Sequence, residues 1–259
     1  MGLAGTKPKK IIDCAKWLQA VVRAEDVIVA NHRWRAVSEI VQARLLGVAI
    51  LLRGFSAPDQ AAILAKWERV SFRIYGLGAM DARTKVGEYT RLAWAIINDH
   101  LSAAQVLDEL TVLGSDYPIS AVIEQFDASN CYDNWTEELR YLFYRYDEYL
   151  ARKVGTKLNE TQWNKIWSED PAKSIEHIQP QSSGMSYIHR LGNLMMLAPS
   201  VNSSLKDTDP SLKAERYRSC GLLSGIEVGK LIGNGKWNKA AVEAREQKLL
   251  SWAKIEWKD

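Results

Sequence analysis

The chain has 259 residues, of which 47% are hydrophobic and 25% are charged, and its formal net charge is +3. This composition is typical of a soluble globular protein with room for one large or two modest domains. Three scattered cysteines exclude a disulfide framework, and the absence of a Cys-x-x-Cys pair excludes a zinc knuckle.

Apolar segments are too short for a membrane helix. The longest strongly apolar stretch covers residues 45–52 and is interrupted by Gly47, whereas a span needs about 20 apolar residues. The first seven residues lack the apolar core of a signal peptide. We therefore expect a cytoplasmic protein with no membrane contact.

Helical periodicity dominates the first 150 residues. Apolar side chains recur three and four residues apart, which is the spacing of one helix face. The predicted helices cover residues 11–22, 37–48, 61–72, 86–97 and 106–113. Gly76 and Gly78 separate the third helix from the fourth, and Gly114 ends the fifth. The N-terminal half is thus predicted to be α-helical.

A further helix is predicted from Asn134, because Glu137 follows three residues later as in a capping box. Its aromatic residues either stack on bases or pack inside the protein, and packing is favoured. The aromatic residues in question are Trp135, Tyr141 and Tyr144. A glycine at residue 155 follows this helix, and we place the domain boundary there, giving an α-helical domain at 1–153 and a second domain at 154–259.

The second domain has a different pattern. Two short apolar stretches, each bounded by polar, Gly, Ser or Pro residues, predict strands joined by a loop at 181–187. The helices predicted after them cover residues 201–205, 210–217, 221–232 and 237–257. Residues 153–259 carry 16 Lys and Arg against 12 Asp and Glu, whereas residues 1–152 carry 18 against 19. This bias agrees with a phosphate-binding surface in the second domain.

Four polar residues of the second domain form an ordered set. Glu176 directly precedes His177 in the first apolar stretch, Asn193 lies in the second, and Asn202 follows, with Lys206 close behind. Hydrolysis of a phosphodiester needs an activated water, charge stabilisation and help for the leaving oxygen. Histidine suits the first task because its pKa lies near neutrality. The set therefore predicts a small phosphodiesterase centre.

These residues resemble the HNH, or ββα-metal, nuclease motif. More closely, they resemble the C-terminal nuclease domain of GmrSD-type, modification-dependent (type IV) restriction endonucleases, in which an acidic-His-Ile-x-Pro strand precedes a Leu-Gly-Asn-Leu strand, an Asn-rich helix start, a lysine and a tyrosine. The corresponding elements here are residues 176–180, 191–197 and 202–205, Lys213, Tyr217, and a closing helix at 237–252 that contains Arg245. The resemblance implies a mostly α fold with a small ββα-metal (HNH) core in an α+β nuclease domain.

The resemblance also implies residue roles. His177 would be the general base and Asn193 would brace the segment that holds it. Glu176 and Asn202 would be the metal ligands, and an asparagine oxygen favours Mg²⁺ or Mn²⁺ over zinc. The candidates for contact with nucleic acid are Lys206, Lys213, His189 and Arg190. The alternative to nucleic-acid contact is a solvated surface position for the two lysines and a role in loop packing for His189.

The expected function is a divalent-metal-dependent DNA endonuclease in bacterial restriction and anti-phage defence. Members of the family usually carry a nucleotide-hydrolysing or modification-sensing N-terminal domain, and this sequence has no Walker-type phosphate loop. Such a domain or subunit would therefore be a partner. The alternatives are a catalytically silent module that binds DNA or a partner, and an RNA nuclease. A complete set of four polar residues favours the enzyme.

Overall fold

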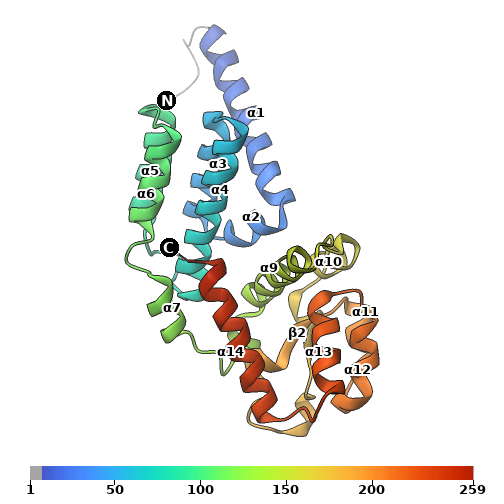
Figure 1. The fold of residues 1–259 in the computed structure, drawn as a ribbon. Coiled ribbons are helices and arrows are strands. Elements are labelled where there is room, and N and C mark those ends of the chain that lie inside the picture. Colours follow the sequence, from blue (N-terminus) through green and yellow to red (C-terminus); the bar gives the residue numbers. More distant parts are fainter. Residues whose placement is uncertain (1–7, 259) are drawn as a thin grey trace. The chain divides into compact units, whose positions relative to one another are not determined.

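The computed structural model describes residues 8–258, and helices predominate among them (Figure 1). The chain divides into two compact units, one formed by Phe126–Glu256 and the other by the residues before it together with Trp257 and Lys258. Over the described range, no helix is long and apolar enough to span a membrane. The first seven residues, on which the signal-peptide expectation rests, lie outside that range.

The described part of the first unit contains helices and their connecting loops but no strand. Its helices are α1 (Pro8–Ala30), α2 (His32–Val37), α3 (Val41–Arg53), α4 (Ala57–Ser71), α5 (Val86–Asn98), α6 (Ala103–Leu113) and α7 (Ile119–Gln125). A π-helical turn, η1 (Phe72–Leu77), continues directly from α4. The five helices predicted in this region correspond to α1, α3, α4, α5 and α6, but α1 is longer than expected and α3 begins at Val41 rather than at residue 37. The helices α2 and α7 were not predicted.

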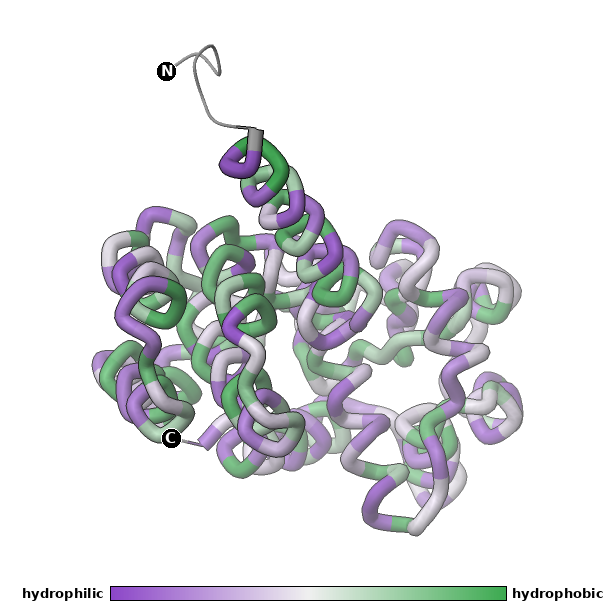
Figure 2. Tube along the Cα trace, turned by 90° about the horizontal axis from the view of Figure 1, so that it is seen from above, coloured by the Kyte–Doolittle hydropathy of each residue, from purple (hydrophilic) through white to green (hydrophobic). Residues whose placement is uncertain are grey.

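Local sequence signals set several of these helix ends. Ser102 and Gln105 form a capping box at the start of α6, in which each residue bonds the backbone N–H of the other. The core lies where α3 packs on α1 and α5, and where α4 packs on α6. Along the tube in Figure 2, hydrophobic and hydrophilic residues are interspersed along the helices, as is usual in amphipathic helices. In this core Trp67 is fully buried, and its indole N–H donates to Ala43 O at 3.0 Å.

The second unit surrounds a two-stranded sheet with helices. Its helices are α8 (Cys131–Asn134), α9 (Thr136–Val154), α10 (Glu160–Trp167), α11 (Pro199–Leu205), α12 (Pro210–Arg218), α13 (Leu223–Gly233) and α14 (Lys239–Glu256). Three 3₁₀ turns link them: η2 (Pro171–Lys173), η3 (Gln181–Ser183) and η4 (Leu191–Asn193). The four helices predicted after the strands are confirmed, whereas α8 and α10 were not predicted.

The sheet consists of β1 (Ile175–His177) and β2 (Leu194–Met196), which are antiparallel. Glu176 lies opposite Met195, and His177 lies opposite Leu194. Both strands fall inside the two predicted apolar stretches, and α11 follows β2 directly. All six strand residues are buried, because helices of the same unit cover the sheet. Strands this short are stable only when they are packed against other elements.

The structure differs from the sequence analysis at α9. Asn134 ends α8 and does not cap α9; the residue at that cap is Trp135, which makes no capping hydrogen bond through its side chain. The units divide between Gln125 and Phe126, whereas we placed a boundary after residue 153. The physical reason is that α9 packs against α13 and β2, so it belongs to the unit that contains the sheet.

The favoured role of the aromatic residues near α9 is confirmed. Trp135, Tyr141 and Tyr144 are exposed by no more than 6% of their surface. Tyr144 meets the rings of Trp163 and Trp167 edge-on, at centroid separations of 5.1 and 5.8 Å. These side chains pack inside the second unit and present no stacking platform for bases.

Candidate active site

His177 ends β1 in a group of polar and aromatic side chains. Its Nε2 lies 3.2 Å from Nδ1 of His189, and the amide nitrogen of Gln181 lies 3.1 Å from its Nδ1. The ring of Tyr132 contacts both imidazoles: it meets His177 edge-on at a centroid separation of 4.5 Å and stacks on His189 at 5.2 Å. These contacts hold the His177 ring in one orientation at the end of the strand.

The surroundings of His177 keep its imidazole neutral. Its side chain is buried, with 7% of its surface exposed. Burial lowers the pKa of His177 to about 4, and the charges of His189 and Lys213 act in the same direction. The neutral form therefore predominates at pH 7, and a neutral imidazole can accept a proton.

Glu176 points toward α12, on the other side of β1 from its neighbour in sequence. Its Oε1 accepts a hydrogen bond from Nζ of Lys213 at 2.7 Å and another from the hydroxyl of Tyr217 at 2.6 Å. All three side chains are buried. Burial raises the pKa of the Glu176 carboxyl, whereas the ammonium and hydroxyl donors oppose that rise. The three residues form a buried charge-assisted cluster beneath the strand.

Lys213 also contacts the backbone beside the histidine. Its Nζ donates to His177 O at 2.9 Å, so one ammonium joins the carboxylate of Glu176 to the end of β1. The side chain of Lys213 is 1% exposed. This position differs from the expected contact with a nucleic-acid phosphate, because the ammonium is turned into the protein core.

Asn193 is fully buried and bonded at every polar atom of its side chain. Its Oδ1 accepts from Gln179 N at 2.8 Å and from the indole N–H of Trp237 at 3.0 Å. Its Nδ2 donates to Gln179 O at 3.0 Å and to Ile188 O at 2.9 Å. The amide therefore ties the segment after β1 to the segment before β2, which is the geometry that a brace for His177 requires.

The helix α14 holds the second motif stretch from the other side. Arg245 donates from one guanidinium nitrogen to Gly192 O and to Leu194 O, both at 2.8 Å. Arg190 forms an ion pair with Glu246 of the same helix. Arg190 was a candidate for contact with nucleic acid, but its guanidinium is engaged with this carboxylate and is only 26% exposed.

Asn202, on α11, fastens that helix to the first strand. Its Nδ2 donates to Lys173 O at 2.9 Å and to Ile175 O at 3.0 Å. Because the amide nitrogen takes both bonds, the amide oxygen is the atom that Asn202 offers to a ligand. The side chain lines an open cavity of about 380 Å³ with Lys173, Pro199, Ser200 and Ser203.

The two remaining candidates differ in their settings. Lys206 is exposed and follows α11 with a positive φ of 46°. His189 is partly exposed and lies against His177. The structure thus brings His189 to the candidate base and leaves Lys206 at the surface.

The residues present suit a hard cation with few protein ligands. In the part of the chain that the structure describes, no group of three or more His, Cys, Asp or Glu side chains could hold a metal ion. The predicted donors, a carboxylate of Glu176 and an amide of Asn202, are both oxygen donors. Mg²⁺ commonly binds through one or two such protein oxygens, with water and substrate phosphate completing its shell. As metal ligands, two oxygen donors of this kind would favour magnesium or manganese over zinc.

Sequence reasoning missed three residues of this site. Gln181 directly follows the motif residues 176–180, four residues after His177, so proximity was the available signal. Trp237 and Tyr132 reach the site from distant segments, and no spacing rule connects them to the motif. Tyr217 was noted as part of the family pattern, but its contact with Glu176 is visible only in the structure.

One comparison with known proteins gives a match. The model of the family described as GmrSD restriction endonucleases, C-terminal domain, matches residues 118–252. No curated protein and no solved structure matches the chain. The matched range includes His177 together with Tyr132, Gln181 and His189, which contact its ring.

Proposed function

Because this chain belongs to the family of GmrSD restriction endonuclease C-terminal domains, we propose that it is a metal-dependent DNA endonuclease of the HNH type. The observation that carries the proposal is the neutral, buried imidazole of His177, held at the end of β1 beside the Asn193 brace. In this proposal β1, β2 and α11 form the ββα-metal core.

His177 is the general base of the proposed reaction. The neutral imidazole takes a proton from a water molecule, and the resulting hydroxide attacks the phosphorus. The contact between His177 and His189 supports this role, because it fixes the orientation of the His177 ring. Asn193 contributes by position, since its four hydrogen bonds hold the two segments on either side of the histidine.

Glu176 and Asn202 are the proposed metal ligands. Both hydrogen bonds to Glu176 end on Oε1, which leaves Oε2 as the oxygen available to a cation. Lys213 and Tyr217 thus orient the carboxylate. Lewis-acid stabilisation of the leaving 3′ oxygen is the chemistry that Mg²⁺ or Mn²⁺ supplies when bound.

DNA is the proposed substrate, and bacterial defence by restriction is the proposed context. The HNH centre has little sequence preference. We therefore place target selection in a nucleotide-hydrolysing or modification-sensing domain or subunit that acts with this chain. A single centre cuts one strand at a time. Cleavage of both strands then requires two copies or two successive cuts.

The test is cleavage of supercoiled plasmid by the full chain with Mg²⁺ or Mn²⁺. His177→Asn keeps a polar side chain of similar size but removes the base, so we expect cleavage to fall at least about 100-fold, the usual scale of general-base catalysis. His100→Asn is the matched control, because His100 is exposed and lies in the first unit. Asparagine also tolerates the positive φ of 54° found there.

Three outcomes separate the alternatives. Metal-dependent cleavage that EDTA and His177→Asn abolish supports the proposal. Full cleavage by a folded His177→Asn protein would overturn the assignment of the base. A folded parent protein that binds DNA but does not cut it, with either metal and with modified or unmodified plasmid, would favour the silent binding module.

A further inference from the structure

The helix α1 exposes a large part of its apolar surface. Every side chain from residue 9 to residue 19 is exposed, and this end of the helix extends away from the rest of the first unit (Figure 1, Figure 2). Seven of the large hydrophobic side chains that are exposed in the described chain lie on α1. Exposed apolar surface that is concentrated on one element marks an interaction site.

Four of these side chains form a line along the helix, which we call the apolar stripe. Ile11, Leu18, Val22 and Val29 are separated by seven, four and seven residues. At 3.6 residues per turn they fall within about 40° of one another around the helix axis. Their exposed fractions lie between 39% and 56%, so the stripe is open to solvent along its whole length.

The face that α1 buries against its own unit is a different one. Ala24 and Ile28 are buried there, with 7% and 0% of their surface exposed, and α1 packs on α3. These two residues lie about 120° around the helix axis from the apolar stripe. The stripe therefore remains available to a partner while α1 is packed in its unit.

The stripe is complementary to itself when two copies run in opposite directions. Ala15 and Glu25 occupy the gaps in the stripe, and its positions then alternate by four and three residues, as the a and d positions of a coiled coil do. In an antiparallel pair centred on residue 20, Leu18 faces the second copy's Val22, and Ala15 faces its Glu25. The outer layers of the same register pair isoleucine with valine, so every layer joins side chains that fit together.

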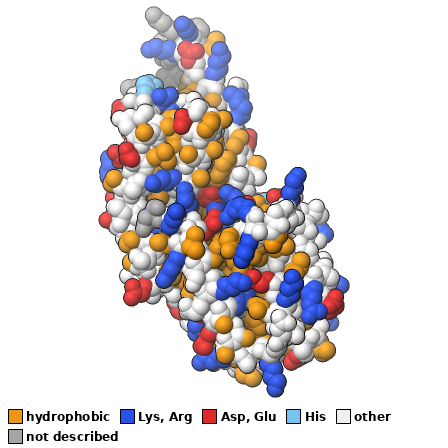
Figure 3. Space-filling model, in the orientation of Figure 1, with side chains coloured by type: hydrophobic (Ala, Val, Ile, Leu, Met, Phe, Trp, Pro, Cys, Tyr) orange, Lys and Arg blue, Asp and Glu red, His pale blue; other side chains and the backbone are white. Residues whose placement is uncertain are grey.

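Charge favours the antiparallel direction. Residues 9–18 carry three lysines and one aspartate, whereas residues 19–30 carry one arginine, one glutamate and one aspartate. Figure 3 shows basic and hydrophobic side chains together at the projecting end of α1. An antiparallel pair places the basic half of each helix beside the acidic half of the other, whereas a parallel pair would place like charges together.

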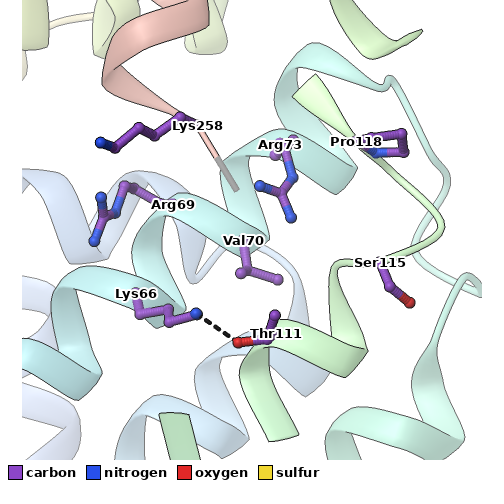
Figure 4. Close-up of a pocket in the computed structure, with 8 residues that line it drawn as sticks. All are labelled: Lys66, Arg69, Val70, Arg73, Thr111, Ser115, Pro118 and Lys258. Carbon is purple, nitrogen blue, oxygen red and sulfur yellow. Dashed lines mark hydrogen bonds between the residues drawn. The ribbon is translucent and has the colours of Figure 1, made fainter. Parts of the chain in front are cut away.

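Another hollow of the first unit is a poorer site for such a partner. The cavity drawn in Figure 4 has a volume of about 250 Å³. Lys66 Nζ of α4 donates to the hydroxyl of Thr111 of α6 at 2.6 Å, shown there as a dashed line. A helix with its side chains is about 10–12 Å across, so a cavity of this volume does not admit one.

We propose that α1 forms an antiparallel pair with α1 of a second copy of this chain. Burial of the apolar stripe from both copies supplies the driving force, and the charges of the two halves set the direction. The pair would bring two candidate nuclease centres into one assembly, as cleavage of both strands requires. Its formation does not depend on cleavage, so it is tested without DNA.

The first test measures the mass of the full chain by sedimentation equilibrium over a range of protein concentrations, where we expect a reversible monomer–dimer equilibrium. Leu18→Glu/Val22→Glu places like charges in the central layers, so the dissociation constant should rise at least about 100-fold. Val112→Glu/Leu212→Glu is the matched control, because these side chains lie on other helices and are 64% and 74% exposed. It should leave the dissociation constant unchanged, and circular dichroism checks that each variant keeps its helices.

The second test determines the direction of the pair by cross-linking. Cys14→Ala removes the exposed native thiol, and Ala15→Cys and Glu25→Cys are made separately in that background. The antiparallel pair predicts a disulfide-linked dimer when the two proteins are mixed and oxidised, but little in either protein alone, because identical positions then lie about 15 Å apart along the axis.

Two results would overturn the proposed association: a chain that stays monomeric at every concentration, and a dimer that the stripe variant leaves as stable as the control does. Cross-linking of each cysteine protein with itself, with no gain on mixing, would overturn the antiparallel direction.

Discussion

At the scale of single residues, the second unit depends on polar groups that are buried together. Lys213 and Tyr217 lie one helical turn apart on α12, so both reach the same oxygen of Glu176. A buried carboxylate is costly unless donors compensate it. Removing one partner of such a pair leaves an uncompensated buried charge. The resulting loss of folding stability is larger than the net contribution of the intact pair.

A double-mutant cycle measures the coupling between Glu176 and Lys213. We expect Lys213→Met to lower the free energy of unfolding by about 3–5 kcal/mol and the double variant Glu176→Gln/Lys213→Met to lose much less than the two single changes combined. Urea denaturation provides the measurement. Glu215 and Arg218 form an exposed pair with a distance of 2.8 Å, and their cycle should give a coupling below about 1 kcal/mol. Equal couplings for the two pairs would contradict the compensation argument.

At the scale of elements, a close approach between η4 and α14 determines where the second motif stretch lies. A Cβ at Gly192 would stand 2.0 Å from Val242 O and 3.1 Å from Cβ of Glu246. Because the first of these neighbours is helix backbone, it has no rotamer that would relieve the clash. Arg245 donates a hydrogen bond to the carbonyl oxygen of this same glycine. This hydrogen bond therefore depends on the close approach of η4 to α14.

Gly192→Ala tests this contact. The methyl group must push α14 and η4 apart, and we expect the free energy of unfolding to fall by about 1–3 kcal/mol, as overpacking usually costs. We also expect cleavage to decrease, because Asn193 is the next residue. Gly235→Ala is the matched control, since a Cβ there meets nothing within 4 Å. Equal stability of the two variants in urea would show that α14 can move away without cost.

At the scale of the whole molecule, the chain consists of two compact units, and the one that carries the candidate nuclease centre begins well before the motif. The helix α9 supplies large buried side chains to this unit, including Phe143 and Tyr146, both with 0% exposure. Asp147 of the same helix accepts hydrogen bonds from Ser224 N at 2.7 Å and from the indole of Trp163 at 3.1 Å. These contacts join α9 to both α13 and α10.

Two fragments test where the nuclease unit begins. A fragment of residues 126–256 retains α9, and we expect it to unfold cooperatively when monitored by circular dichroism during urea titration. A fragment of residues 154–256 begins at the boundary expected from the sequence and lacks α9, so we expect it to show no cooperative transition. Cooperative unfolding of the shorter fragment would place α9 outside the folding unit.

Local sequence signals were enough to predict most of the helices, the two short strands and the resemblance to the family. Periodicity, capping residues and glycines are local signals, and the order of Glu176, His177, Asn193 and Asn202 is visible along one stretch of chain. For this reason most predicted elements agree with the structure. The error at Asn134 arose because α8 ends there and α9 begins after it, a distinction that the capping pattern does not contain.

Which side chains contact one another became visible only in the folded chain. Several contacts join segments that lie far apart in sequence. They are the contact of Lys213 with Glu176 in the core, the ion pair of Arg190 with Glu246, and the contacts of Tyr132 and Trp237 at the site. The assignment of α9 to the second unit has the same origin. The physical reason is that burial and charge compensation depend on what the rest of the fold brings near a residue, whereas helix and strand formation depends largely on its neighbours in the chain.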